Sequence, residues 1–198
     1  MINRFVIVWG LISTLCMGLV VSGLLLNSIS WRPADYNNIL MSIAIYSIYW
    51  VLLAILQGAA LFWKFQDKAV AYKWFFTTSI TGFIVMFLHD FIILNVMKTD
   101  TRGQGVLILI LSLPILALSG GFILGLAQLW LIRNRYKPNL ETIPLNILWL
   151  FLGVISWVIG FAGMYFGSFF PLILLLYSVG SIIKGWFINK YLCSSLTN

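Results

Sequence analysis

The chain has 198 residues, of which 62% are hydrophobic and only 9% are charged, and its mean hydropathy is +1.03. Soluble domains carry roughly 25% charged residues, so this composition excludes an ordinary water-exposed surface and indicates that the surrounding solvent is lipid. The net charge of +7 does not indicate nucleic-acid binding, because the basic residues gather at the ends of apolar segments rather than on one face.

Six apolar segments are each long enough to span a bilayer, for which about 20 apolar residues suffice. They lie near Phe5–Asn27, Ile39–Trp63, Trp74–Met97, Val106–Ile132, Ile143–Tyr165 and Ser168–Asn189. Each is predicted to be a helix, because backbone groups in lipid must be satisfied within the segment. The prediction is therefore an all-α integral membrane protein of one domain, with six transmembrane helices in three antiparallel hairpins at about 1–72, 73–140 and 141–198.

Lysine and arginine are distributed unevenly between the two predicted sides of the membrane. One side receives nine of the twelve, namely Arg4, Lys64, Lys68, Lys73, Arg133, Arg135, Lys137, Lys184 and Lys190. The other side receives Arg32, Lys98 and Arg102. Cytoplasmic loops carry the excess of basic residues, so both termini are predicted to lie in the cytoplasm and the protein in the plasma (inner) membrane.

A short phrase recurs at the ends of the even-numbered segments. Its copies are Leu56–Lys64, Ala127–Arg135 and the more divergent Ile183–Lys190. Each copy places one polar residue before a basic, aromatic end, and these polar residues are Gln57, Gln128 and Lys184. Each odd-numbered segment carries a tryptophan near its start, and these are Trp9, Trp74 and Trp149. The pattern predicts a pseudo-threefold internal repeat of parallel two-helix units about an axis along the membrane normal.

The phrase Gly125–Arg133, followed by a polar turn and a tryptophan-bearing segment, resembles a motif of uncharacterised bacterial multi-pass membrane proteins. Those proteins repeat a small-x-x-Gln-x-x-x-Leu-Arg phrase. The resemblance covers roughly Leu52–Gly82 and Gly121–Gly160, with Lys64 in the place of the arginine of the first copy and Lys184 in the place of the third glutamine. It implies a topology and no activity.

Catalytic chemistry is not indicated by the residue types present. The single histidine excludes haem ligation by paired histidines of one chain, and the two cysteines, Cys16 and Cys193, form no metal-ligand spacing. Motifs such as Gly-x-Ser-x-Gly and His-Glu-x-x-His do not occur. We therefore expect no enzymatic activity, no metal and no cofactor.

Polar residues recur at one depth near the predicted cytoplasmic face. They are Gln57, Gln128, Lys184, Thr77, Thr78 and Asn146. Polar groups in lipid face the bundle interior, so these side chains are predicted to gather in one polar layer. Two interpretations stay open: hydrogen bonds that join helices, or a cytoplasm-facing pocket in which Lys184 attracts an anionic head group or solute.

A second candidate is the pair His89 and Asp90, within the third segment. An ionisable residue inside a membrane span indicates an intramembrane proton or ion site. The alternative is that Asp90 bonds a neighbouring helix or water near the outer interface, with His89 among the head groups.

These observations favour a non-catalytic membrane protein, such as a scaffold, an anchor or a partner-binding subunit of a membrane complex. A small-solute or lipid transport component with the cytoplasm-facing pocket is the alternative, and a pore-forming membrane effector is a second one. The expected partners are membrane lipids, including anionic ones, and a membrane protein or further copies of this chain, but no nucleic acid.

Overall fold

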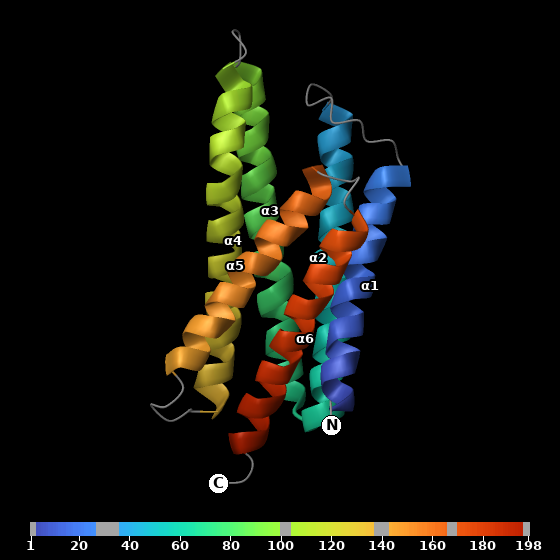
Figure 1. Ribbon diagram of the computed structural model, residues 1–198, viewed down its shortest axis with the longest axis vertical. Helices are drawn as coiled ribbons and strands as arrows, with labels where there is room; N and C mark the ends of the chain where they lie inside the picture. The colour runs from blue at the N-terminus through green and yellow to red at the C-terminus, as the bar shows by residue number, and fades with distance from the viewer. Residues whose placement is uncertain (1–2, 27–35, 100–103, 137–142, 166–169, 196–198) are drawn as a thin grey trace.

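The computed structural model describes residues 3–26, 36–99, 104–136, 143–165 and 170–195, which form six helices and no strand (Figure 1). The helices are α1 (Arg4–Leu26), α2 (Tyr36–Phe65), α3 (Lys68–Thr99), α4 (Gln104–Tyr136), α5 (Ile143–Tyr165) and α6 (Phe170–Ser195). The prediction of an all-helical chain with six helices is confirmed.

Several helices run further than the apolar segments that predicted them. α3 begins at Lys68 rather than near Trp74, and α6 continues to Ser195 rather than ending near Asn189. Hydropathy marks only the apolar part of a helix, whereas the backbone hydrogen bonds continue into polar ends where water or side chains satisfy the last groups.

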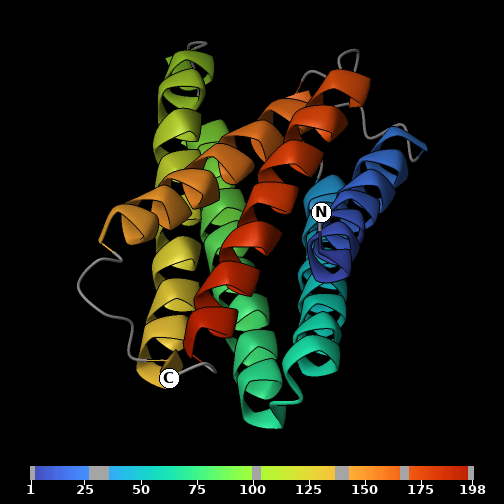
Figure 2. The ribbon, with the colours of Figure 1, turned by 60° about the horizontal axis from the view of Figure 1, so that its bottom comes forward.

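The six helices form a closed ring. Each helix packs against its neighbours in the sequence, and α6 returns to pack against α1, as the two views in Figures 1 and 2 show. Because successive helices are antiparallel, α1 begins and α6 ends at the same end of the bundle (Figure 1). At that end the Asn3 Nδ2 donates to Asn189 Oδ1 over 3.0 Å, so a hydrogen bond joins the two edges of the ring.

The connection between α2 and α3 is a tight turn. Gln66 adopts a left-handed backbone conformation with φ of 54° and donates its N–H to Phe62 O over 2.8 Å, which ends α2. Asp67 then caps α3, because its Oδ1 accepts the Val70 N–H over 3.1 Å. These two residues reverse the chain and set α2 and α3 side by side.

Glycines allow α4 and α5 to approach with their backbones in contact. A Cβ added to Gly121 would lie 2.6 Å from Val154 Cα and 2.7 Å from Gly153 O. A Cβ added to Gly153 would in turn lie 2.8 Å from Gly121 O. Only glycine fits at this crossing, as is usual where helices pack through small residues.

Large apolar side chains cover the outside of the ring. On α1 the outward positions recur every fourth residue, at Ile7, Leu11, Leu15 and Leu19. Over the part of the chain that the structure describes, two stretches are long and apolar enough to cross a membrane by length and composition, Ser47–Phe65 of α2 and Lys68–Leu88 of α3.

Candidate binding site at the centre of the ring

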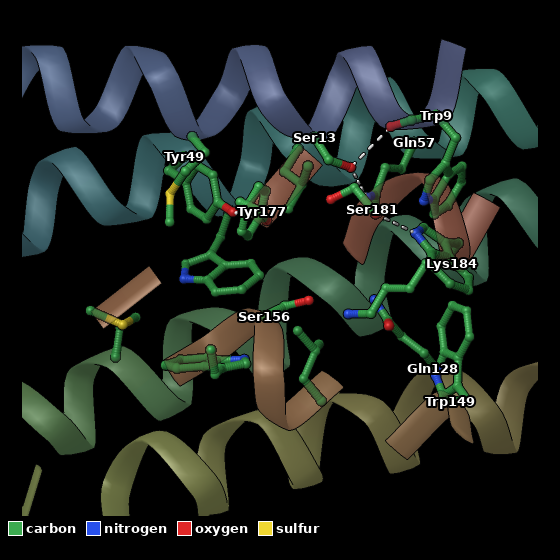
Figure 3. A pocket seen from close by; sticks show the side chains of 17 residues that line it. Trp9, Ser13, Tyr49, Gln57, Gln128, Trp149, Ser156, Tyr177, Ser181 and Lys184 are labelled. Carbon is green, nitrogen blue, oxygen red and sulfur yellow. Dashed lines mark hydrogen bonds between the residues drawn. The ribbon is translucent and has the colours of Figure 1, made fainter. Parts of the chain in front are cut away.

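A cavity of about 70 Å³ lies on the axis of the helical ring (Figure 3). All six helices contribute to its wall. The lining residues are Trp9, Ser13 and Met17 of α1, Tyr49, Trp50, Leu53 and Gln57 of α2, Trp74 and Met86 of α3, Leu124 and Gln128 of α4, Trp149, Ser156 and Trp157 of α5, and Tyr177, Ser181 and Lys184 of α6. Closure of the ring therefore creates this space.

One end of the cavity is built on three tryptophans that open the odd-numbered helices. Trp9, Trp74 and Trp149 are each only 1% exposed. The ring centroids of Trp9 and Trp74 are 5.5 Å apart, and those of Trp74 and Trp149 are 6.3 Å apart, both in edge-to-face geometry. Such contacts fix the ring positions, because edge-to-face pairs stabilise beyond the area they bury.

Gln57 joins three helices at this end. Its Nε2 donates to Ser13 Oγ of α1 over 3.1 Å, and its Oε1 accepts the indole N–H of Trp74 of α3 over 3.1 Å. The side chain is buried, so both ends of the amide need these partners.

Gln128 repeats the first of these contacts in the second hairpin. Its Nε2 donates to Thr78 Oγ1 over 3.1 Å, and both residues are buried. Thr78 stands four residues after Trp74, as Ser13 stands four residues after Trp9. The two bonds therefore connect corresponding sequence positions of two hairpins.

Lys184 takes the corresponding place in the third hairpin but has a different environment. Four residues after Trp149 the chain carries Gly153, which offers no hydroxyl group. The half-buried Lys184 places its Nζ 5.7 Å from the ring centroid of Trp149, within the range of a cation–π interaction. In Figure 3 the side chains of Lys184 and Gln128 extend toward the same part of the cavity.

The indole N–H groups around the cavity differ in their partners. Trp74 donates to Gln57, and Trp149 Nε1 donates to Gly125 O over 3.1 Å. The buried N–H groups of Trp9 and Trp50 have no acceptor among the described residues. Since buried donors are nearly always paired, these two groups are unusual.

The other end of the cavity is aromatic and apolar. The hydroxyl groups of Tyr49 and Tyr177 lie 2.8 Å apart and share a hydrogen bond between α2 and α6. Trp50 stacks on Trp157 with ring centroids 5.5 Å apart, and Met86 packs in the same cluster. Figure 3 shows Tyr49 and Tyr177 at one end and Trp9, Gln57 and Lys184 at the other.

Three of the predicted polar-layer residues, Gln57, Gln128 and Lys184, line this cavity, and Thr78 bonds one of them. Thr77 of α3 and Asn146 of α5 are half-buried and are not part of its wall. The backbones of His89 and Asp90 belong to α3, but their side chains lie outside the described residues, so the proton or ion site stays a prediction.

Sequence reasoning missed Ser13, Tyr49 and Tyr177. Ser13 could have been found by aligning the odd-numbered helices on their tryptophans, because in that alignment Ser13 and Thr78 occupy the same position. No comparable signal marks the tyrosines, since their pairing depends on the return of α6 to the ring.

The donor groups and aromatic walls suit noncovalent binding of a small solute. Within the described ranges no group of three or more histidine, cysteine, aspartate or glutamate side chains could hold a metal ion. No family model, curated protein or solved structure matches the chain.

Proposed function

We propose that this chain is a multi-pass membrane protein that holds a small solute in the cavity at the centre of its helical ring, as the binding component of a transport system. The single observation that carries the proposal is the placement of Gln57, Gln128 and Lys184 in one interior cavity to which all six helices contribute. Polar and charged groups are costly inside a membrane protein and usually mark a substrate path or binding site.

The outward surface supports membrane spans for all six helices. Exposed large apolar residues occur on each of them, for example Leu15, Ile48, Phe76, Ile115, Phe151 and Leu175. A surface of this kind is covered by lipid in a spanning helix. The two stretches found by length and composition would then be joined by four further spans.

The charges support a cytoplasmic location for the polar end of the cavity. Arg4 is the first residue of α1 and Lys68 the first of α3, while Lys64 lies in the last turn of α2 and Arg133 near the end of α4. Antiparallel helices bring these residues to one end of the bundle, near which Lys184 and Gln57 also lie. Basic residues favour the cytoplasmic side, so the cavity would receive its polar ligand group at that side.

The size and lining limit the ligand to a small amphipathic molecule. A buried water needs at least about 10–15 Å³ of such volume, so a cavity of about 70 Å³ accepts a few waters or a small organic solute. A polar group would lie at Gln128 and Lys184 and an apolar part against the stacked rings of Trp50 and Trp157, as in most ligand pockets.

The proposal is tested by identifying what co-purifies with the tagged protein in mild detergent. Native mass spectrometry is expected to show a bound small molecule, lost in Ser156→Leu, whose larger side chain fills the cavity wall. Phe151→Leu is the matched control on α5, because Phe151 is exposed on the outer face. A protein that carries no small molecule, or that loses it equally in both variants, would contradict the proposal.

A scaffold is the second candidate, and one surface feature favours it. Phe83, Phe87 and Phe91 form a stacked, exposed row along α3, with successive ring centroids 6.3 and 6.4 Å apart. Such a row fits the face of another membrane helix. A stoichiometric protein partner in the same purification, released by Phe87→Ala, would favour the scaffold over the solute-binding component.

A further inference from the structure

We propose that the cavity recognises a carboxylate group, and that the Lys184 ammonium and the indole N–H of Trp9 are the donors that bind it. This inference rests on the proposed function and names the ligand class for the same site. A short-chain monocarboxylate, with its carboxylate at these donors and its apolar part toward Trp50, is the ligand that the wall fits best.

The first hairpin makes a hydrogen bond to the next helix that the third hairpin cannot make, whereas in the second hairpin Trp149 donates to Gly125 O instead. On α2, Gln57 offers an amide oxygen that accepts the indole N–H of Trp74 on α3, the next helix of the ring. In the closed ring α1 follows α6 as α3 follows α2. The position on α6 that corresponds to Gln57 is Lys184, and lysine has three donors but no acceptor.

Because Lys184 offers no acceptor, the indole N–H of Trp9 lacks the kind of partner that Trp74 has. The Trp9 indole is the counterpart of Trp74 and is only 1% exposed, yet its N–H has no acceptor in the described part of the chain. Burying such a donor without an acceptor is unfavourable, because the N–H loses its hydrogen bond to water and gains none in the protein. An acceptor atom of a ligand at the place where Gln57 puts its amide oxygen would remove that cost.

Lys184 and Trp9 belong to one corner of the cavity. Both line it, and the Trp9 side chain packs against Gly185, the residue after Lys184. A Cβ added to Gly185 would lie 2.9 Å from Trp9 Cβ and 3.1 Å from Trp9 Cδ1, so the tryptophan lies directly on α6. Trp9 of α1 and the α6 segment that carries Lys184 are therefore in contact at the seam that closes the ring, where we place the bound carboxylate.

The charge of Lys184 has no acidic partner in the wall. The cavity is lined by aromatic, apolar, hydroxyl and amide groups and by no aspartate or glutamate among the described residues. The ring of Trp149 stabilises a cation in part, at 5.7 Å. A carboxylate would supply both the negative charge and the acceptor that Trp9 lacks, through a charge-assisted hydrogen bond.

The test uses butyrate and its neutral isostere butyramide, which differ in charge and in acceptor oxygens but hardly in size. Tryptophan fluorescence of the purified full-length protein is the readout, because five tryptophans line the cavity. Saturable butyrate binding with Kd on the order of 1 mM is expected, a reasonable affinity for so few atoms. Butyramide is expected to bind at least about tenfold more weakly.

Two variants test whether the preference for butyrate over butyramide depends on Lys184 and Trp9. Lys184→Gln removes the charge and gives Trp9 an acceptor, so butyrate binding should weaken by about 10- to 100-fold while butyramide binding changes little. Trp9→Phe keeps an aromatic side chain, although a smaller one, and removes the indole N–H, which should weaken butyrate binding by about two- to tenfold. The melting temperature of each variant in detergent reports whether it folds.

Lys190→Gln is the matched control. Lys190 also lies on α6 and its Nζ is 5.1 Å from the ring centroid of Trp186, but both residues are exposed on the outside. Removing its charge therefore changes the net charge as Lys184→Gln does without touching the cavity. Butyrate binding by this variant should match that of the unchanged protein.

The outcomes separate this inference from the proposed function. Equal binding of butyrate and butyramide would leave a solute-binding cavity but overturn the carboxylate, and so would a butyrate preference that survives Lys184→Gln. Absence of binding by butyrate, butyramide and dodecanoate would overturn both proposals. Dodecanoate carries the same head group on a lipid-like chain, so its tighter binding, lost in Lys184→Gln, would identify a fatty acid as the source of the carboxylate.

Discussion

At the scale of single residues, the interior of this protein depends on whether each buried donor has an acceptor. Gln57 donates to Ser13 and accepts from Trp74, and Gln128 donates to Thr78. Lys184 stands at the corresponding position and can accept nothing. In the proposed carboxylate site, this one difference in residue type would leave the Trp9 N–H to be satisfied by a ligand.

Gln57→Leu tests the structural half of that statement. The substitution keeps the volume but leaves the Trp74 N–H without its acceptor, so stability should fall by about 1–2 kcal/mol. Thermal unfolding in detergent is the measurement. Gln66→Ala is the control, because the exposed Gln66 bonds only its own turn through Trp63 O and should change stability by less than about 0.5 kcal/mol. Equal melting temperatures for Gln57→Leu and the unchanged protein would contradict the prediction.

At the scale of helices, the contacts between neighbours are of two kinds. α4 and α5 meet through the backbones of Gly121 and Gly153, whereas α1 and α6 meet through polar side chains such as Thr14 and Ser178, whose oxygens are 2.9 Å apart. The backbone contact between α4 and α5 has no room for an added atom, whereas side chains such as Thr14 and Ser178 can adjust by small rotations. Added atoms at the α4–α5 crossing would therefore meet backbone, whereas at the α1–α6 glycines they would meet the side chains of Ile182 and Trp9.

Gly121→Ala should separate α4 from α5. The added methyl group would meet backbone atoms at 2.6 and 2.7 Å, which cannot move without shifting a whole helix, so a loss of about 1–3 kcal/mol is expected. Gly18→Ala is the matched control, because its methyl group would meet only Leu174 Cδ1 at 3.9 Å. The melting temperatures of the two variants in detergent are compared. A Gly121→Ala protein as stable as the Gly18→Ala control would show that α4 and α5 pack less closely than described.

Hydropathy and the recurring phrase predicted the helices and three of the cavity residues, but not the contact between the tyrosines or the exact helix ends. Apolar length identified all six helices, and the phrase indicated Gln57, Gln128 and Lys184. It could not supply the Tyr49–Tyr177 bond, because that contact joins α2 to α6 between residues distant in sequence and has no local pattern. The ends of α3 and α6 were placed too far inward, since polar ends of a helix have no hydropathy signal.

At the scale of the whole molecule, an even number of antiparallel helices brings both ends of the chain to one side of the bundle. Under the proposed topology, the basic residues at the ends of the helices would place that side in the cytoplasm, because lysine and arginine are retained there. The polar end of the cavity would then face the cytoplasm, and its aromatic end would face the opposite side of the membrane.

The orientation is open to a labelling experiment. Single cysteines introduced as Asn3→Cys or Thr197→Cys, in a chain whose own cysteines are replaced, should react with an impermeant thiol reagent only after the cells are opened. A cysteine introduced between α3 and α4, such as Thr101→Cys, should react in intact cells and serves as the control. Reaction of either end from outside would refute the proposed topology.

The seam between α1 and α6 also determines when the cavity can exist during synthesis of the chain. Of the six helices, α1 is synthesised first and α6, which packs against it, is synthesised last. The face of α1 that carries Ser13 and Thr14 therefore has no contact with α6 while the intervening helices emerge. At synthesis rates of about 5–20 residues per second, that interval is on the order of ten seconds. Until then α2 is the main neighbour that can shield those groups. In the proposed membrane, a chain released after α5 would have a central cavity that is open to lipid along one side.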